Sequence, residues 1–298
     1  MKKIKVLPVY PKFPLTLWGH QKALKYVGKS AVMTPTGEAT VLAMLPEDKF
    51  EIHRIIDLNV EELTDQQIKD CDIGMISEMK LQEDAGKEII KRFHHHGKKV
   101  VEGGPYVTAY TERSIADYLV CGEAEITFPA FIEDLVKGNA KKIYTEENVI
   151  KEGRCLAKLM ANNKPYLTET PIPRWDLLDL KKYHSPAVQF SRGCPHNCEF
   201  CDIKCLFGRI PRTKEPEQMI KELDALKNTG YSGPAMFVDD NILGHKKRLR
   251  ELLQILNLDV GMKLENFDPN RRTGKELNLY RIKRLWEEKH KRDHGIAT

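Results

Sequence analysis

The sequence predicts an α/β protein whose first part is a doubly wound parallel sheet of the Rossmann or flavodoxin-like type. Three observations support this fold class. Short apolar runs alternate with helix-like stretches over the first 140 residues, as expected for a parallel sheet with helices on both faces. The number of such runs, five, suits a flavodoxin-like sheet. Glycines and polar residues follow several of the runs, where such sheets bind ligands.

Each predicted strand or helix is a segment whose apolar residues recur with the spacing of that element and which polar or turn residues bound. The expected strands are Ile4–Val9, Phe50–Ile56, Ile73–Ser77, Lys99–Val101 and Tyr118–Cys121. The expected helices are Gly37–Leu45, Thr64–Lys69, Gln82–His96 and Ala124–Val136. Three consecutive histidines end the third of these helices. Because adjacent helical residues point in different directions, we expect a solvated surface there and not a metal site.

Candidate ligand contacts come directly after the predicted strands. They are Ser77, then Gly103, Gly104 and Pro105, and finally Gly122 and Glu123. Paired glycines let the backbone approach a large ligand closely, since no Cβ intrudes. The same residues are also typical of a plain turn, and Glu123 and Glu125 favour a helix N-terminus. From the residues alone, both interpretations remain open.

A second domain is expected after a linker over residues 141–184. Within the linker Ile143–Tyr144 could add a strand, whereas the prolines of Thr170–Trp175 exclude a helix interior. Beyond the linker, the expected elements are strands at Val188–Ser191 and Ala235–Val238 and a helix at Lys246–Leu256.

Composition excludes several functional classes. The chain has 298 residues, a length that suits two domains. Its net charge is +5, but residues 263–298 hold ten Lys and Arg against six Asp and Glu, so the excess belongs to the tail and predicts no nucleic-acid partner. No apolar run is long enough to predict a membrane span, and the N-terminus does not resemble a signal peptide, so we expect a cytoplasmic protein.

The seven cysteines are unevenly spaced. Cys71, Cys121 and Cys155 are scattered and are expected to be small, mostly buried residues. The others crowd into one segment, which in a reducing compartment indicates metal or redox chemistry. They are Cys194, Cys198, Cys201 and Cys205.

The first three of these thiols, at spacing C-x3-C-x2-C, could hold three irons of a [4Fe–4S] cube and leave the fourth iron open to a ligand. A structural zinc site using His196 or Cys205 is an alternative, as is a ferredoxin-like cluster with Cys205 as fourth thiolate.

The pattern Cys194-x3-Cys198-x-Phe200-Cys201 resembles the radical S-adenosylmethionine (SAM) superfamily. The wider sequence looks like the branch with an N-terminal cobalamin-binding domain, which includes hopanoid methylases. Further matching segments lie in the expected order: residues 103–105, 122–125, 171–176, 189–194, 207–214 and 237–241.

The resemblance implies a cofactor set. Cys194, Cys198 and Cys201 would ligate the [4Fe–4S] cluster, with Phe200 counted among the cofactor-binding residues. SAM would chelate the open iron and be cleaved to a 5′-deoxyadenosyl radical. Asp239 and Asp240 stand where the superfamily often holds the methionine amine, although with Asn241 they would also suit a strand-end turn.

The resemblance also implies that the first domain holds cobalamin, through the residues that follow its strands. The Asp-x-His-x-x-Gly motif that supplies an axial histidine is missing. The first loop, Trp18-Gly19-His20, has a histidine without that spacing. We therefore expect cobalamin to bind without a cobalt ligand from the protein.

The predicted organisation is a cobalamin-binding-like domain (1–140), a linker (141–184), a partial radical SAM domain (185–262) and a basic tail (263–298) with a helix at Lys275–Lys291. A six-unit barrel needs on the order of 190 residues, but 114 remain from Ser185, so the barrel is expected to be incomplete.

The implied function is cobalamin-dependent methylation, or a related C–H functionalisation, of a small or lipid-like substrate. A reductant such as ferredoxin or flavodoxin would supply the electron. The alternative is a truncated, non-catalytic iron–sulfur-binding or electron-transfer protein.

Overall fold

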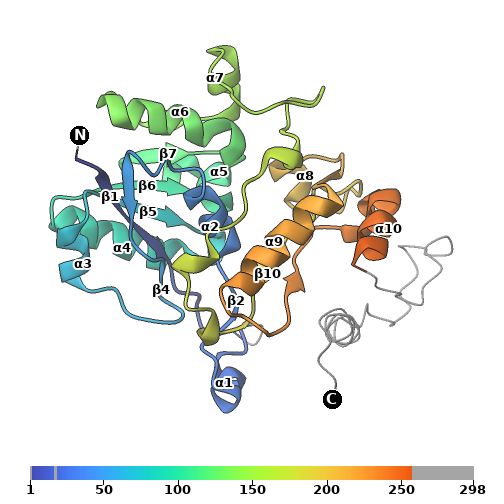
Figure 1. The fold of residues 1–298 in the computed structure, drawn as a ribbon. Helices are drawn as coiled ribbons and strands as arrows, with labels where there is room; N and C mark the ends of the chain where they lie inside the picture. The colour runs from blue at the N-terminus through green and yellow to red at the C-terminus, as the bar shows by residue number, and fades with distance from the viewer. Residues whose placement is uncertain (1, 17–18, 257–298) are drawn as a thin grey trace.

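A parallel sheet forms the centre of the protein (Figure 1). The computed structural model describes residues 2–16 and 19–256. Seven strands make up the sheet. They are β1 (Ile4–Tyr10), β3 (Phe50–Ile52), β4 (Ile56–Asp57), β5 (Ile73–Ser77), β6 (Lys99–Gly103), β7 (Tyr118–Val120) and β8 (Ile143–Tyr144).

The strand order confirms the predicted fold class. The strands run β3-β1-β5-β6-β7-β8, with β4 pairing the end of β1, and every pairing is parallel. If β4 is left out and the strands are renumbered by their order in the chain, β3-β1-β5-β6-β7 becomes 2-1-3-4-5. This is the flavodoxin-like order. Ligands of such sheets bind beyond the carboxyl ends of the strands, and this edge carries Ser77, Gly103 and Gly122.

Helices cover both faces of the sheet and bury two separate apolar clusters. On one face lie α2 (Thr36–Leu42) and α6 (Ala124–Lys137), and on the other α3 (Asp65–Asp70), α4 (Glu83–His95) and α5 (Pro105–Ala109). Leu42 and Phe131 belong to the first cluster, and Ile89 and Phe93 to the second. The doubly wound arrangement follows from this two-sided burial.

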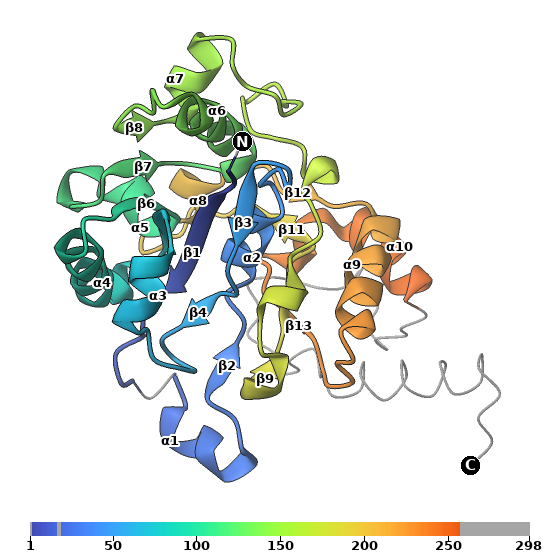
Figure 2. The ribbon, with the colours of Figure 1, turned by 60° about the vertical axis from the view of Figure 1, so that its left-hand side comes forward.

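The remaining helices and strands lie outside this sheet and its covering helices. The helices are α1 (Gln21–Leu24), α7 (Glu146–Lys151), α8 (Ile203–Leu206), α9 (Pro216–Asn228) and α10 (Lys246–Ile255). The strands are β2 (Ala31–Met33), β9 (Tyr183–Ser185), β10 (Ala187–Val188), β11 (Ser191–Arg192), β12 (Arg212–Thr213) and β13 (Met236–Phe237). Figure 2 shows α9, α10 and β11–β13 beside α2.

The two parts of the chain share one apolar core. Residues of the second part, such as Phe190 and Met219, belong to the same cluster as Leu42. The strand β2 pairs in parallel with β9, and the Thr36 hydroxyl donates to the carbonyl of Ala187. The N-terminal segment around α2 is therefore built into the second part, which hydrophobic periodicity did not reveal.

Two predicted strands are interrupted. Phe50–Ile56 was expected as one strand, which is wrong, because the N–H of Ile55 leaves the sheet to donate to Leu177. Val188–Ser191 was also expected as one strand. It is split between β10, which pairs in parallel with β13, and β11, which pairs antiparallel with β12. The carboxylate of Asp239 accepts the N–H groups of Phe190 and Ser191 at this change of partner.

Sequence reasoning missed the helix α9. It starts with Pro216 in its first turn, and Glu215 and Gln218 form a reciprocal cap at its N-terminus, both of which are helix-start signals. The predicted helix Lys275–Lys291, the tail from 263 and Trp18 lie outside the described residues. Among the helices that the structure describes, none combines the length and the apolar character that crossing a bilayer demands.

Candidate functional site

A pocket opens at the carboxyl ends of three neighbouring strands, β5, β6 and β7. It is lined by Glu38, Val41, Met75, Ile76, Ser77, Val101, Gly103, Gly104, Val120, Gly122, Ala124 and Phe128. The structure thus brings together four of the residues proposed as cofactor contacts: Ser77, Gly103, Gly104 and Gly122. Two further candidates that follow the strands do not line the pocket: Pro105 occupies the first turn of α5, and Glu123 lies outside the lining.

Gly104 needs the conformational freedom of glycine. Its φ is +94°, and a Cβ there would lie 2.8 Å from the Ser77 hydroxyl and 3.2 Å from the backbone of Glu78. Any larger residue would be strained and would push on the adjacent strand end. The need for glycine at this position therefore comes from Ser77 and Glu78, which lie against it.

Glu38 is a pocket residue that sequence reasoning missed. It lies on α2 and is 3% exposed, and neither of its carboxylate oxygens has a hydrogen-bond partner in the described part of the chain. Burial, and then the nearby Asp57, raise the pKa of Glu38 well above its usual range. A signal existed in the sequence, because an acidic residue on the helix face shared with Leu42 breaks the apolar pattern.

The cysteine segment forms an irregular loop that begins at Arg192, the last residue of β11. Gly193 has a φ of +91°, and a Cβ on it would lie 2.9 Å from the carbonyl oxygen of Ile210. The N–H of Cys194 donates to Gly208 at 3.3 Å, and the Asn241 amide lies 3.5 Å from the Cys194 sulfur. The start of the loop is therefore held at several points.

The thiols of this loop are free. Cys194 and Cys201 are partly buried, whereas Cys198 and Cys205 are exposed, and Phe200 is 90% exposed. Within the described ranges, no three His, Cys, Asp or Glu side chains are already gathered closely enough to hold a metal ion. As a donor set, three unpaired thiols within eight residues fit an iron–sulfur cluster.

Asp239 and Asp240, proposed as contacts of the methionine amine, bind the backbone of the cysteine segment. Asp239 accepts from the Ser191 hydroxyl at 2.6 Å as well as from backbone N–H groups. Asp240 accepts from the N–H of Gly193 at 3.0 Å. Burial raises the pKa of both carboxyl groups, against the lowering effect of these hydrogen bonds.

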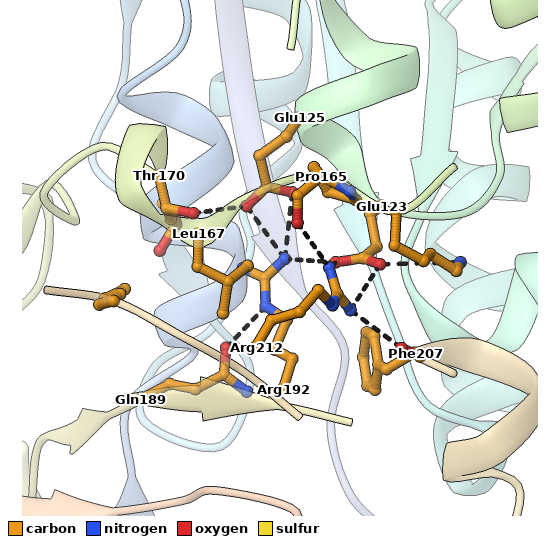
Figure 3. Close-up of polar contacts among 12 residues, drawn as sticks. Glu123, Glu125, Pro165, Leu167, Thr170, Gln189, Arg192, Phe207 and Arg212 are labelled. Atoms are coloured by element: carbon orange, nitrogen blue, oxygen red, sulfur yellow. Dashed lines mark hydrogen bonds and ion pairs between the residues drawn. The ribbon is translucent and has the colours of Figure 1, made fainter. Parts of the chain in front are cut away.

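A buried ion-pair network links this loop to the pocket edge (Figure 3). Arg192 lies 3.0 Å from both Glu123 and Glu125, and Arg212 lies 2.9 Å from Glu123. Lys164 lies 3.6 Å from Glu123. Thus Glu123, which follows the pocket residue Gly122, binds the arginine that precedes the cysteine loop.

The network keeps Glu125 ionised in spite of its burial. Burial opposes the charge, but Arg192 and the hydroxyl of Thr170, which donates at 2.9 Å, hold the pKa of Glu125 at about 2. The same carboxylates outweigh the burial of Arg192 and raise the pKa of that guanidinium. The charges therefore form a buried connection between the two parts of the chain.

A second buried carboxyl group, Glu78, should make stability depend on pH. Burial and the adjacent Glu102 raise the pKa of Glu78 to about 9. Because the folded-state pKa lies above the ordinary value of 4.5, the stabilising contribution is complete at low pH and is lost as pH rises through about 9. Between about pH 5 and pH 9, we expect the unfolding free energy of the unaltered chain to fall by more than about 1.4 kcal/mol relative to Glu78→Gln.

Urea unfolding of both chains across that pH range checks this prediction. Glutamine keeps the shape of the protonated acid but cannot ionise. Parallel stability curves would contradict a neutral Glu78 in the folded protein.

Comparisons with known proteins agree with the cysteine loop and the fold. Residues 188–292 match the model of the radical SAM superfamily. The chain is 40% identical over 258 residues to an uncharacterised methyltransferase from Synechocystis sp. (86% of this chain, 45% of that protein). It is 31% identical over 255 residues to the hopanoid C-2 methylase from Rhodopseudomonas palustris (84% and 45%).

A solved structure shows the same fold. The radical SAM methyltransferase TsrM from Kitasatospora setae, solved with cobalamin and a [4Fe–4S] cluster bound, superimposes with a TM-score of 0.54 at 15% identity. The match covers 86% of this chain and 51% of TsrM. The chain spans about half the length of these relatives.

Proposed function

Because this chain belongs to the radical SAM superfamily, we propose that it is a cobalamin-dependent radical SAM enzyme of the methyltransferase kind. Cys194, Cys198 and Cys201 would hold a [4Fe–4S] cluster. The pocket beyond β5, β6 and β7 would hold cobalamin. These cofactors supply electron transfer to SAM, radical formation and methyl carriage.

One observation carries the proposal: the buried connection between the two cofactor sites. Arg192 precedes the cysteine loop and binds Glu123, which adjoins the pocket residue Gly122. A methyl carrier and a radical source must be kept at a fixed separation, and a preorganised polar network serves that purpose. We assign the positioning of the loop to Arg192, Asp239 and Asp240.

We propose separate roles for the pocket, which would bind the corrin, and for the cysteine loop, which would bind the cluster and SAM. Gly103 and Gly104 would let the sheet edge approach the corrin, and the exposed Phe200 would cover the SAM site. We propose residues 1–140 as the cobalamin domain and residues 185–262 as the cluster domain, joined by a linker over 141–184. The hopanoid methylase similarity supports a small or lipid-like substrate, with ferredoxin or flavodoxin as the reductant.

Anaerobic reconstitution of the full chain tests the proposal. We expect about four irons per chain, a cluster spectrum that changes when SAM is added, and 5′-deoxyadenosine under reductant. Hydroxocobalamin binding is measured separately by its absorbance. A cluster that ignores SAM and yields no 5′-deoxyadenosine would exclude the enzyme, whereas lack of cobalamin binding would remove only the cobalamin requirement.

A further inference from the structure

Glu38 is a buried carboxyl group whose polar atoms have no partner among the residues that the structure describes. Both oxygens are inaccessible to water and lack a hydrogen bond. Leaving buried polar groups unpaired costs about 1–3 kcal/mol each, so such groups in native proteins call for an explanation, and a ligand is one. Glu38 lines the pocket at the sheet edge, where a ligand could reach it.

The neighbouring polar groups already have other partners. The hydroxyl of Tyr183 donates to Asp57 at 2.8 Å, and the N–H and side-chain amide of Asn59 donate to the other Asp57 oxygen. Tyr10 is hydrogen-bonded to Gln82. These contacts leave Glu38 as the group of this cluster without a partner.

The protonation state of Glu38 defines what it can recognise. Burial and the neighbouring Asp57 raise the pKa of Glu38 and so favour the neutral acid, which offers one O–H donor next to one carbonyl acceptor. Tyr10 and Tyr183 lie near Glu38, and burial raises the pKa of both phenols, so both stay protonated and uncharged.

The rest of the lining matches a neutral ligand group. Apart from Glu38, the lining residues in the described part of the chain are apolar or glycine, with Ser77 as the one hydroxyl. Among the described lining residues there is no cation to attract a carboxylate or phosphate. A primary carboxamide fits this chemistry, because its N–H donates to the acid carbonyl while its oxygen accepts the acid O–H.

We propose that Glu38 recognises a primary carboxamide of the ligand in this pocket. On the proposed function, on which this inference rests, that carboxamide is one of those on the rim of the corrin ring of cobalamin. Glu38 is then a binding residue that selects the uncharged amide side chain. Both hydrogen bonds would be made by the two carboxyl oxygens of Glu38, which have no other partner among the described residues.

Equilibrium titration with hydroxocobalamin tests the assignment without relying on activity. We expect Glu38→Leu to weaken binding by about tenfold, the equivalent of the lost pair of neutral hydrogen bonds. Glu38→Gln keeps a donor and an acceptor and should stay close to the unaltered affinity. Glu78→Gln is the matched control, since Glu78 is buried at the same sheet edge but lies outside the pocket lining.

Corrin derivatives with one carboxamide hydrolysed to a carboxylate identify the contact itself. The unaltered chain should bind one such isomer about tenfold more weakly, because a buried charge would face the neutral acid. In Glu38→Leu the carboxylate of that isomer would still be buried, so this variant is tested with the intact corrin alone. Its melting temperature without ligand should be at least that of the unaltered chain, because an unpaired buried group has been removed.

The outcomes separate the two proposals. If the unaltered chain does not bind cobalamin, the cobalamin part of the proposed function and this inference both fail. If it binds cobalamin and Glu38→Leu binds equally well, the proposed function stands and the role of Glu38 is overturned.

Discussion

We expect Cys198→Ala to retain less than about one iron per chain after anaerobic reconstitution, against about four for the unaltered chain. Three thiolates are the protein's whole contribution to an open-site cluster, so the loss of one leaves two irons without a protein ligand. Cys198 is exposed and its side chain makes no hydrogen bond in the described structure, so alanine should leave the fold intact. Iron and sulfide analysis with the visible spectrum measures the loss, and far-ultraviolet circular dichroism checks the fold.

Cys205→Ala is the matched control. This thiol is also exposed, lies on α8 four residues beyond Cys201 and is spare if the cluster has an open iron. It should keep both the iron content and the spectral response to SAM. Loss of the cluster in Cys205→Ala would instead support the ferredoxin-like alternative, in which all four iron ligands are thiolates.

The sheet and its ligand-binding edge could be predicted because they depend on local patterns. Ile73–Ser77 is predicted with the bounds that the structure shows, and β8 was foreseen as a possible strand. Gly103 and Gly104 were singled out because a glycine pair at a strand end has a physical purpose, and the φ of Gly104 requires it. Periodicity and turn chemistry carry this information.

The connection between the two parts could not be predicted, because it depends on contacts between distant residues. Glu123 was expected to touch the cofactor, but its carboxylate is held by Arg192 and Arg212, 69 and 89 residues away. Single-sequence patterns say nothing about such pairs. Glu38 was missed for a related reason: its burial becomes apparent only when α2 is packed against the sheet.

We expect Arg192→Met to lower the unfolding free energy at pH 7 by about 3–5 kcal/mol, the usual cost of removing one partner from a buried ion pair. Arg192 is the cation nearest to Glu125, and it also donates to Glu123 at 3.0 Å and to the Gln189 side chain at 2.9 Å. Methionine fills much of the same space but leaves Glu125 charged, buried and without its cation. Urea unfolding followed by circular dichroism measures the change.

The sign of the pH dependence gives a second readout. In the unaltered chain the pKa of Glu125 is lowered to about 2 from its ordinary 4.5, so its contribution is complete above about pH 4.5 and is lost as pH falls through about 2. Without Arg192, burial is no longer offset by a neighbouring cation, and the pKa of Glu125 rises. Arg192→Met should therefore be most destabilised near neutral pH and should approach the unaltered chain as the solution is acidified.

Two further variants separate the ion pair from simple loss of volume. Arg248→Met makes the same substitution in a half-exposed pair with Glu215 and Glu251 and should cost roughly 0–1 kcal/mol. Combining Arg192→Met with Glu125→Gln removes the stranded charge and should recover part of the loss, because contacting residues are not additive. If Arg192→Met costs no more than Arg248→Met, the network does not hold the cysteine loop against the sheet, and the connection between the two proposed cofactor sites must lie elsewhere.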